Sequence, residues 1–237
     1  KSGLPNAIKV GKEMESSGEK LKGIRLDSGD LAYLSRKARK MLDDAGLDYV
    51  KIAASNQLDE YLIKSLNDQK AQIDVYGVGT SLMTGQPDAA LDGVFKLASY
   101  DNEPRIKLSD SAAKISLPDK KQVFRLLDNK GMFFGADVIT LHDEEKTHTM
   151  HHPFEALKKM KIGDCPAEKL LKTVMKDGKR KQPKHNTEET ARYARERLAQ
   201  LPEEHKRFEY PHIYKVGLSD KLNDERNRLI ETHKAEN

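Results

Sequence analysis

The first third of the chain alternates between stretches of helical periodicity and short apolar runs. Apolar side chains that recur every three to four positions predict amphipathic helices over residues 4–16, 30–44 and 58–66. Short apolar runs bounded by turn residues predict strands over residues 21–26, 49–54 and 73–76. Strand–helix units in succession are typical of parallel βα architecture, in which the strands form either a barrel or an open doubly wound sheet. The spacing alone does not decide between these two folds.

From residue 93 onward the hydrophobic period changes from helical to alternating. The alternation predicts strands over residues 93–100, 105–109, 122–127 and 132–141, with turns at 101–104 and 128–131. Tight turns between neighbouring strands favour antiparallel pairing. Beyond residue 142 the chain is more polar. Its pattern there predicts a loop at 150–153, a hairpin turning at Asp177-Gly178, and helices over 187–200 and 219–235.

Composition narrows the class of protein. Of the 237 residues, 34% are charged and 37% hydrophobic, and the formal net charge is +4. Positive and negative residues are interspersed, so no one-sign tail indicates a nucleic-acid partner. No apolar run approaches the ~18–20 residues of a membrane span. The single cysteine, Cys165, excludes an intrachain disulfide and suits a reducing compartment. We expect a cytoplasmic globular protein with neither a nucleic-acid nor a membrane partner.

Polar residues follow each of the three strands predicted in the first part of the chain. The first strand ends in Arg25, Asp27 and Ser28, the second in Ser55 and Asn56, and the third in Gly77, Gly79, Thr80 and Ser81. Because the carboxyl ends of parallel strands meet at one edge of a sheet, these residues are expected to lie together where ligands bind.

Two of these strand ends suggest particular chemistry. Arg25 and Asp27 share one face of a strand and suit a charged ligand, although the alternative is a buried ion pair of the core. The Gly-x-Gly-Thr-Ser turn exposes consecutive N–H groups and adds hydroxyl donors, a combination that suits a phosphate. The alternative is a tight turn in which Gly77 and Gly79 only supply positive φ angles.

Six segments carry a family resemblance. They are residues 22–31 (KGIRLDSGDL), 76–81 (YGVGTS), 93–97 (GVFKL), 104–109 (PRIKLS), 114–118 (KISLP) and 121–125 (KQVFR). In this order they resemble segments of the nicotinate phosphoribosyltransferase family, whereas residues 142–237 match less distinctively. The resemblance implies an α/β fold, part of the irregular TIM-like α/β barrel of the type II phosphoribosyltransferases, with antiparallel β strands and a helical C-terminal tail.

The resemblance also implies a division of the chain and a reaction. Residues 1–100 would be barrel βα units carrying the phosphoribosyl site, 101–141 a β-rich segment completing the barrel or small domain, and 142–237 a largely helical extension. The implied reaction, a ligase-type pentosyl transfer in NAD salvage, joins nicotinate to phosphoribosyl pyrophosphate (PRPP) and gives nicotinate mononucleotide and pyrophosphate. ATP hydrolysis is coupled to it and Mg²⁺ assists. The implied partners are nicotinate, PRPP, ATP and, in a homodimer, a second copy of the chain.

The residues at the strand ends suit roles in this reaction. Arg25 would pair with the nicotinate carboxylate or a charge beside the pyridine ring, since a guanidinium fork matches a carboxylate. Asp27, the expected catalytic residue, would bind a ribose hydroxyl or oppose the positive charge that develops on the sugar. Ser28, Ser55 and Asn56 would contact ribose or phosphate oxygens, and Gly77, Gly79, Thr80 and Ser81 would hold the 5′-phosphate, with Thr80 also near the nicotinate. No protein ligand for a metal is expected, because Mg²⁺ would sit largely on pyrophosphate.

One expected residue is absent. The family's phosphorylated histidine lies in a Gly-Thr-x-x-His-like segment, and none of the eight histidines of this chain has that context. The chain also starts on a helical pattern without an initiator Met, and it resembles a carboxy-terminal portion without the amino-terminal domain and early barrel strands. We therefore expect the chain alone to make no nicotinate mononucleotide. The alternatives are a catalytically dead phosphate-binding fragment and a relative that uses nicotinamide or quinolinate.

Three weaker candidates have plainer interpretations. His148, His151 and His152 match no standard metal-ligand spacing, which favours a solvated loop. The lysine-rich segment 176–184 has acidic neighbours and no interleaved aromatic residues, which favours a solvated hairpin over a phosphate or RNA site. Cys165 has no basic partner nearby in the sequence and is expected to be inert.

Overall fold

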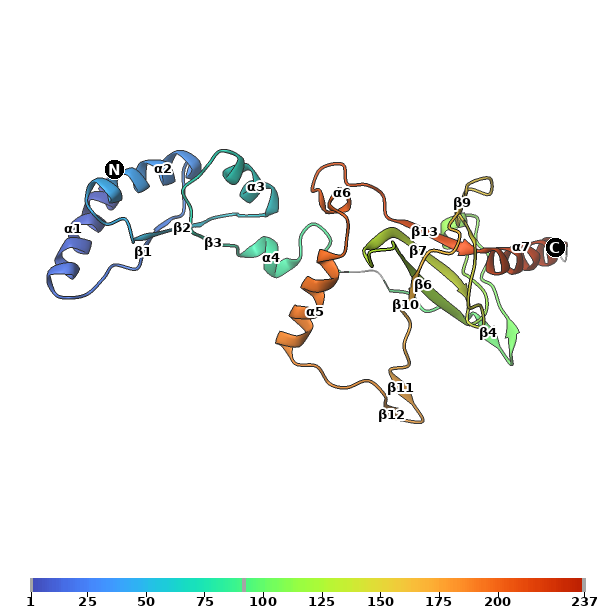
Figure 1. The fold of residues 1–237 in the computed structure, drawn as a ribbon. Helices are drawn as coiled ribbons and strands as arrows, with labels where there is room; N and C mark the ends of the chain where they lie inside the picture. Colours follow the sequence, from blue (N-terminus) through green and yellow to red (C-terminus); the bar gives the residue numbers. More distant parts are fainter. Residues whose placement is uncertain (1, 91–92, 236–237) are drawn as a thin grey trace. The chain divides into compact units, whose positions relative to one another are not determined.

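The structure, a computed structural model, describes residues 2–90 and 93–235. The chain forms two compact units, which we call unit 1 (Lys1–Gly93) and unit 2 (Val94–Asn237) (Figure 1). Unit 1 contains a three-stranded parallel sheet, and unit 2 is organised around a six-stranded mixed sheet.

Unit 1 confirms the predicted alternation of strands and helices. Its elements are α1 (Gly3–Ser16), β1 (Gly23–Leu26), α2 (Leu31–Asp44), β2 (Lys51–Ser55), α3 (Glu60–Asp68), β3 (Val75–Gly77) and α4 (Thr80–Thr84). The strands pair in parallel in the order β1-β2-β3. Every strand and helix predicted in this part is present, with ends shifted by at most two residues.

The ends of α2 follow from the residues that flank it. Asp30 has an extended backbone, and its carboxylate accepts a hydrogen bond from the Tyr33 N–H at 2.9 Å, so Asp30 is the N-cap. Gly46, one residue beyond the C-cap Ala45, has a φ of 67°. This left-handed conformation ends the helix, as is common for glycine. The cap at Asp30 fixes where the chain leaves β1, and so positions the polar residues between β1 and α2.

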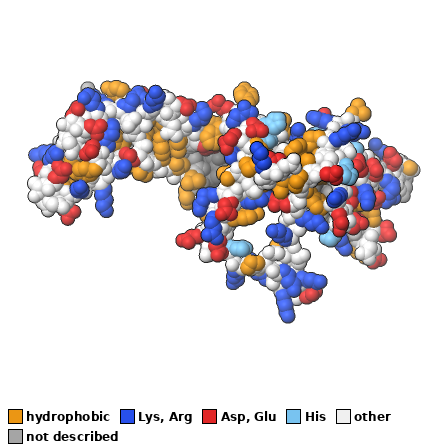
Figure 2. Space-filling model, in the orientation of Figure 1, with side chains coloured by type: hydrophobic (Ala, Val, Ile, Leu, Met, Phe, Trp, Pro, Cys, Tyr) orange, Lys and Arg blue, Asp and Glu red, His pale blue; other side chains and the backbone are white. Residues whose placement is uncertain are grey.

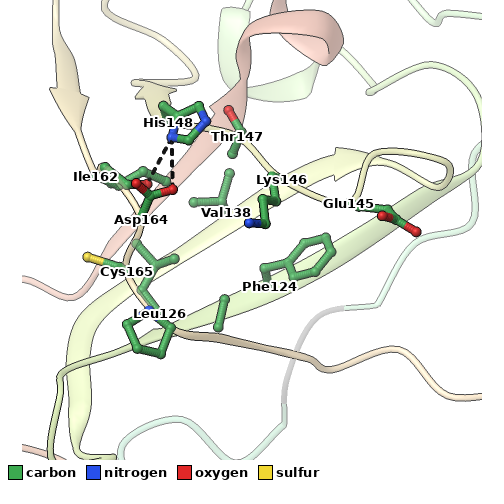
Figure 3. Close-up of a pocket in the computed structure, with 13 residues that line it drawn as sticks. Phe124, Leu126, Val138, Glu145, Lys146, Thr147, His148, Ile162, Asp164 and Cys165 are labelled. Carbon is green, nitrogen blue, oxygen red and sulfur yellow. Dashed lines mark hydrogen bonds and ion pairs between the residues drawn. The ribbon is translucent and has the colours of Figure 1, made fainter.

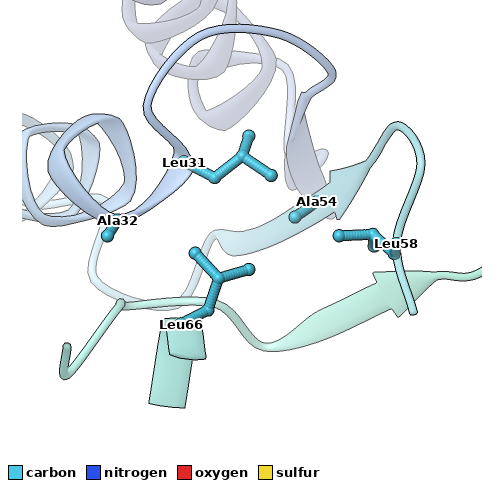
Figure 4. Packing of buried hydrophobic residues seen from close by; sticks show 5 residues of the cluster. All are labelled: Leu31, Ala32, Ala54, Leu58 and Leu66. Carbon is cyan, nitrogen blue, oxygen red and sulfur yellow. The ribbon is translucent and has the colours of Figure 1, made fainter. Parts of the chain in front are cut away.

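The buried side chains of unit 1 lie between the sheet and its helices. Figure 4 shows one cluster, which consists of Leu31, Ala32, Ala54, Leu58 and Leu66. A second cluster consists of Ala38, Leu42, Leu47, Val50 and Ile52, with Leu4 and Ile8 of α1 packed against it. Each fully buried Leu or Ile contributes about 1.5–3 kcal/mol to stability. These clusters hold the helices to the sheet and keep the three strand ends at one edge.

The opposite face of this sheet is open in unit 1. Side chains alternate along a strand, so Arg25, Ala53 and Val75 project away from the face that bears Ile24 and Ile52. Val75 is 52% exposed, and the side chain of Arg25 is 65% exposed. No helix of the described part of unit 1 covers these residues. Since parallel sheets are normally covered on both faces, this open face needs an explanation.

The central sheet of unit 2 has the strand order β10-β6-β7-β13-β8-β9. The strands are β6 (Lys121–Leu127), β7 (Phe133–Leu141), β8 (Thr149–His151), β9 (Lys159–Lys161), β10 (Ala167–Lys169) and β13 (Lys215–Ser219). The helical elements are η1 (Ala112–Lys114), α5 (Thr187–Ala199), α6 (Glu203–Lys206) and α7 (Asp220–Ala235). Separate small hairpins pair β4 (Ser99–Tyr100) with β5 (Glu103–Pro104) and β11 (Met175–Lys176) with β12 (Lys179–Arg180).

The antiparallel hairpin of β6 and β7 was predicted correctly because its turn has a strong local signal. Asp128 Oδ1 accepts hydrogen bonds from the N–H groups of Lys130 and Met132, both at 2.8 Å. Gly131 has a φ of 78°, which glycine adopts readily. The predicted hairpin at Asp177-Gly178 is also present, between β11 and β12.

The prediction of a largely helical extension over 142–237 is wrong. This segment contributes β8, β9, β10 and β13 to the central sheet, and the predicted boundary after residue 141 falls inside that sheet. Strand β13 pairs in parallel with β7 and antiparallel with β8, and so separates two strands that are neighbours in sequence. A five-residue strand that joins a sheet from about 70 residues away leaves little local signal, since long-range packing decides its place.

Two of the predicted strands are reduced to a short hairpin. The structure keeps only Ser99 and Tyr100 of the strands predicted over 93–100 and 105–109. These two residues pair with Glu103–Pro104 around a turn in which Asp101 and Asn102 have positive φ. Val94 is 76% exposed. An alternating apolar pattern forms a strand only where a neighbouring strand takes its hydrogen bonds, and no described strand pairs with the rest of these residues.

The surface agrees with the interspersed charges of the sequence. Figure 2 shows basic and acidic side chains mixed over the visible face of each unit. Among residues 2–90 and 93–235, no helix is both long enough and apolar enough to cross a membrane.

Candidate functional site

The carboxyl ends of β1, β2 and β3 bring predicted site residues together in unit 1. The register of the sheet places Ser55 beside Gly77. Arg25 Nη2 lies 2.8 Å from Asp27 Oδ2, and Arg25 Nη1 donates a hydrogen bond to Ser55 Oγ at 3.0 Å. We call Arg25, Asp27 and Ser55 the Arg25 cluster. It joins two strand ends directly and lies beside the third.

The Arg25 cluster is open to solvent in unit 1. The side chains of Arg25 and Asp27 are 65% and 54% exposed, so the pair is not buried within unit 1. An exposed ion pair contributes only about 0–1 kcal/mol to stability. The stability of unit 1 therefore depends little on this pair, and both groups are accessible to a charged ligand.

Ser28 and Asn56 lie next to the cluster in sequence and are exposed. Asn56 has a φ of 97°, a conformation in which Asn is more common than most residues. Ser28 precedes Gly29, which has a φ of 80° and turns the chain toward α2. Neither side chain makes a hydrogen bond within the described residues, which leaves both available to a ligand.

The third strand end has open space beside its backbone. Gly79 has a φ of −106°, and Gly77 also lacks a positive φ. The alternative that these two glycines only supply positive φ angles is therefore wrong. A Cβ built on Gly79 would meet no atom within 4 Å. The first N–H groups of a helix have no acceptor within the helix, and Thr80 and Ser81 begin α4. Within the described residues no hydrogen bond joins them to the Arg25 cluster.

Asp74 is a residue that sequence reasoning missed. Its Oδ2 accepts a hydrogen bond from the Ile52 N–H at 2.8 Å, and its Oδ1 lies 3.2 Å from Lys51 Nζ. The Ile52 N–H, with help from Lys51, lowers the pKa of the Asp74 carboxyl below its usual value. These bonds tie the chain before β3 to the start of β2 and so help to keep Ser55 beside Gly77. An Asp before a strand is too common in loops to have been noticed.

Unit 2 contains a pocket of about 280 Å³ on one face of its sheet (Figure 3). Phe124 and Val138 contribute to its apolar floor, and His148 Nδ1 lies 3.7 Å from Asp164 Oδ1 at its rim. Cys165 also lines the pocket, but no hydrogen bond joins it to His148 in the described chain. The described ranges contain no cluster of three or more His, Cys, Asp or Glu suited to a metal. Nothing in this pocket forms a reactive thiol–imidazole pair.

A polar network lies on the opposite face of β6 and β7. Arg125 donates from Nε and Nη2 to the two oxygens of Asp137, at 3.1 and 3.0 Å, and the Tyr214 hydroxyl donates to Asp137 Oδ1 at 2.7 Å. The guanidinium groups of Arg125 and Arg197 each lie 4.6 Å from the centre of the Phe133 ring. The network joins the centre of the sheet to the segments that carry α5 and β13, and we interpret it as structural.

The phenol of Tyr214 is expected to make unit 2 sensitive to alkaline pH. Burial, followed by the hydrogen bond to Asp137, raises the pKa of Tyr214 to about 12, whereas an unfolded Tyr has a pKa near 10. Because the folded pKa is the higher one, the stabilisation is complete below pH 10 and is lost as the pH rises toward 12. Between pH 9.5 and 12, the free energy of unfolding measured in urea should fall by about 2 kcal/mol more in the wild type than in Tyr214→Phe. Equal losses in the two proteins would show that Tyr214 is not responsible.

Comparison with solved structures defines the class of the fold. The crystal structure of human nicotinic acid phosphoribosyltransferase matches 96% of this chain with a TM-score of 0.76 at 28% identity, and the match covers 44% of the human chain. A nicotinate-nucleotide pyrophosphorylase from Pyrococcus furiosus matches 80% of this chain and 42% of its own, with a TM-score of 0.59 at 23% identity, a likeness of fold alone. The chain therefore has the mixed α/β fold of part of a phosphoribosyltransferase.

Sequence comparisons show similarity to nicotinate phosphoribosyltransferases. Residues 120–226 match the family model described as the nicotinate phosphoribosyltransferase C-terminal domain. The nicotinate phosphoribosyltransferase of Bacillus subtilis is 38% identical over 230 residues, which are 93% of this chain and 46% of that protein. That of Dictyostelium discoideum is 36% identical, over 94% of this chain and 41% of its own length. The chain is similar to these nicotinate phosphoribosyltransferases, and it spans less than half the length of these two.

Proposed function

We propose that the protein to which this chain belongs transfers the phosphoribosyl group of PRPP to nicotinate in NAD salvage, and that unit 1 carries binding groups for the nicotinate mononucleotide. The observation that carries the proposal is the meeting of Arg25, Asp27, Ser55 and Gly77 at the carboxyl edge of the parallel sheet. In βα folds this edge is where ligands bind. The names of the relatives support the choice of reaction.

In this reaction the pyridine nitrogen of nicotinate forms a bond to C1 of the ribose, and pyrophosphate leaves with the electron pair of the C1–O bond. Positive charge develops on the sugar as that bond breaks. Asp27 supplies a carboxylate at the site, and a fixed charge opposite a developing one lowers the barrier. Arg25 supplies a planar fork for the nicotinate carboxylate, while Ser28, Ser55 and Asn56 supply short polar groups for ribose and phosphate oxygens.

The turn after β3 is proposed to hold the 5′-phosphate of the ribotide. The space beside Gly79 lets a phosphate approach the backbone closely. The N–H groups of Gly79, Thr80 and Ser81 and the two hydroxyls would then donate to its oxygens. Gly77 keeps this turn at the end of the strand that pairs with Ser55.

The open face of the unit 1 sheet is proposed to line the interior of an irregular TIM-like barrel. Such a barrel would cover Val75 and Ala53 with side chains from further strands, as parallel sheets normally require. Asp27 is the one carboxylate of the Arg25 cluster and is paired with Arg25, so this cluster by itself offers no set of carboxylates for Mg²⁺. Mg²⁺ carried on pyrophosphate oxygens fits this better. ATP coupling and homodimer formation are proposed from the family likeness, and a cytoplasmic location from the single cysteine, which suits a reducing compartment.

The proposal is tested by titration calorimetry of the purified chain with nicotinate mononucleotide. One saturable site is expected. Nicotinamide mononucleotide lacks the carboxylate that Arg25 would bind, and its affinity should be at least about tenfold weaker. Equal affinities would favour the nicotinamide-using alternative, and no binding of either ribotide would contradict the proposal.

The 237-residue chain by itself is expected to make no nicotinate mononucleotide. None of its histidines lies in a Gly-Thr-x-x-His-like context, and the chain spans less than half the length of its relatives. The measurement is a steady-state assay with nicotinate, PRPP, ATP and Mg²⁺, in which the Bacillus subtilis relative serves as the positive control. Sustained turnover by the chain would disprove the expectation.

A further inference from the structure

Arg226, on α7 in unit 2, is a buried guanidinium without a charged partner among residues 2–90 and 93–235. Its residue surface is only 8% exposed. Nη1 donates a hydrogen bond to the Pro153 carbonyl at 2.8 Å, but Nε is buried and has no hydrogen-bond partner among the described residues. No ion pair to a carboxylate is present in the described part of the chain. Burial lowers the pKa of Arg226 from its usual value, though an arginine remains charged at neutral pH.

An unpaired buried charge has a large energetic cost. Taking a charged group out of water costs several kcal/mol even after relaxation, and a single hydrogen bond to a carbonyl does not neutralise the charge. Buried charges are therefore usually paired with an opposite charge. Arg226 lacks such a partner within the described residues, so its charge is available to an anion.

A small cavity lies next to this guanidinium. Its volume is about 120 Å³, and its lining residues are Ala112, His152, Pro153, Phe154, Ala156, Asn223, Arg226 and Asn227. Asn223, Arg226 and Asn227 are spaced by three and four positions and so share one face of α7. Each Asn carries an amide that can donate two hydrogen bonds. The helix therefore presents one cation and two neutral donors to a single small space.

The walls of the cavity favour a negative ligand. Arg226 is the charged residue in the lining of the cavity. The lining contains no Asp or Glu. The nearby Glu155 is held 3.2 Å from Lys158 Nζ and 3.4 Å from His152 Nε2. His152 Nδ1 accepts hydrogen bonds from the N–H groups of Phe154 and Glu155, so a neutral His152 carries its proton on Nε2. The negative charge of Glu155 is therefore compensated by Lys158 and by the Nε2–H of His152, and it does not oppose an anion in the cavity.

We propose that this cavity binds a small tetrahedral oxyanion of the size and charge of inorganic phosphate. Arg226 provides the counter-charge, and the amides of Asn223 and Asn227 provide hydrogen bonds. The small volume of the cavity, about 120 Å³, suits a ligand of the size of phosphate. The site belongs to unit 2 and is separate in sequence from the proposed phosphate turn at Gly79. A bound oxyanion would also strengthen the attachment of α7 to the loop at Pro153.

The test is an amide-resolved NMR titration of the full chain with sodium phosphate, with chloride used to hold the ionic strength constant. Saturable shifts are expected for the backbone amides of His152 and of residues 154–156 and 223–227. Arg226→Gln should weaken this response at least tenfold. Sulfate, which has the same geometry, should compete, whereas chloride alone should not reproduce the shifts. The absence of saturable shifts at these amides, or the same affinity in Arg226→Gln, would overturn the proposal.

Two controls separate this site from other effects. Arg228→Gln removes an exposed guanidinium of the same helix, which is paired with Glu225, and should leave the response unchanged. Thr80→Val alters the proposed 5′-phosphate turn in unit 1 and should also leave the shifts of His152 and of residues 154–156 and 223–227 unchanged. If Arg226→Gln does not fold, Asn223→Leu removes a lining donor but keeps the bond from Arg226 to Pro153. Asn223→Leu should weaken phosphate binding. Unchanged phosphate binding in Asn223→Leu would count against the site.

Discussion

Replacing Arg25 with Ala is expected to lower the affinity of the chain for nicotinate mononucleotide by about ten- to a hundredfold. A hydrogen bond to a charged group contributes about 1.5–3 kcal/mol, which corresponds to this range. The substitution removes the fork proposed for the nicotinate carboxylate. It also removes the group that holds Asp27 at 2.8 Å and Ser55 at 3.0 Å. The measurement is titration calorimetry at constant ionic strength.

Two comparisons make the Arg25→Ala result specific. Arg36→Ala changes another exposed arginine of unit 1, whose Nη1 bonds to the Gln69 carbonyl on the helical side, and should leave the affinity unchanged. Nicotinamide mononucleotide should lose much less affinity than nicotinate mononucleotide in Arg25→Ala, because it has no carboxylate. Unchanged binding of nicotinate mononucleotide in Arg25→Ala would remove Arg25 from the site.

Replacing Asp137 with Ala is expected to cost unit 2 about 3 kcal/mol of stability. Breaking a buried ion pair by removing one partner leaves the other charge uncompensated, with typical losses of about 3–5 kcal/mol. Asp137 is 8% exposed, and its removal would leave both the Arg125 guanidinium and the Tyr214 hydroxyl without their acceptor. The side chain of Arg125 retains 24% exposure, which places the expected loss at the lower end. Urea unfolding monitored through unit 2 measures the loss.

The matched control for Asp137→Ala is an exposed pair of the same unit. Glu203 lies 2.8 Å from Lys206 and its side chain is 88% exposed, so Glu203→Ala should change stability by less than about 0.5 kcal/mol. Asp137→Asn keeps an acceptor oxygen but loses the charge. Its loss of stability should therefore lie between those of Asp137→Ala and Glu203→Ala. A loss below about 1 kcal/mol in Asp137→Ala would mean that the network does not support the sheet.

Much of unit 1 could be predicted from the sequence because its folding signals are local. Each strand is a short apolar run, each helix has its own periodicity, and Asp30 and Gly46 mark the ends of α2. Parallel strands separated by single helices place their carboxyl ends at one edge, so the meeting of Arg25 and Ser55 followed from the order of the elements. The resemblance in segments 22–31 and 76–81 then added chemistry that spacing does not provide.

Unit 2 was harder to predict because its contacts are distant in sequence. The place of β13 between β7 and β8 depends on packing across the whole sheet, and nothing in residues 215–219 specifies those neighbours. The pairing of Arg125 with Asp137 was missed for a similar reason, since it appears only when the register of β6 and β7 is known. A buried Arg226 on a polar helix looks like any surface arginine in the sequence. Burial and the missing counter-charge reveal it only in the structure.

The central claim is that the carboxyl edge of the unit 1 sheet binds a nicotinate ribotide. A crystal structure of the chain with nicotinate mononucleotide tests this most directly. The predicted result places the nicotinate carboxylate about 2.7–2.9 Å from the Arg25 guanidinium and the phosphate against the N–H groups of Gly79, Thr80 and Ser81. A ribotide bound only in the pocket beside Phe124 and His148, or one that reaches neither Arg25 nor the turn at Gly79, would contradict the claim.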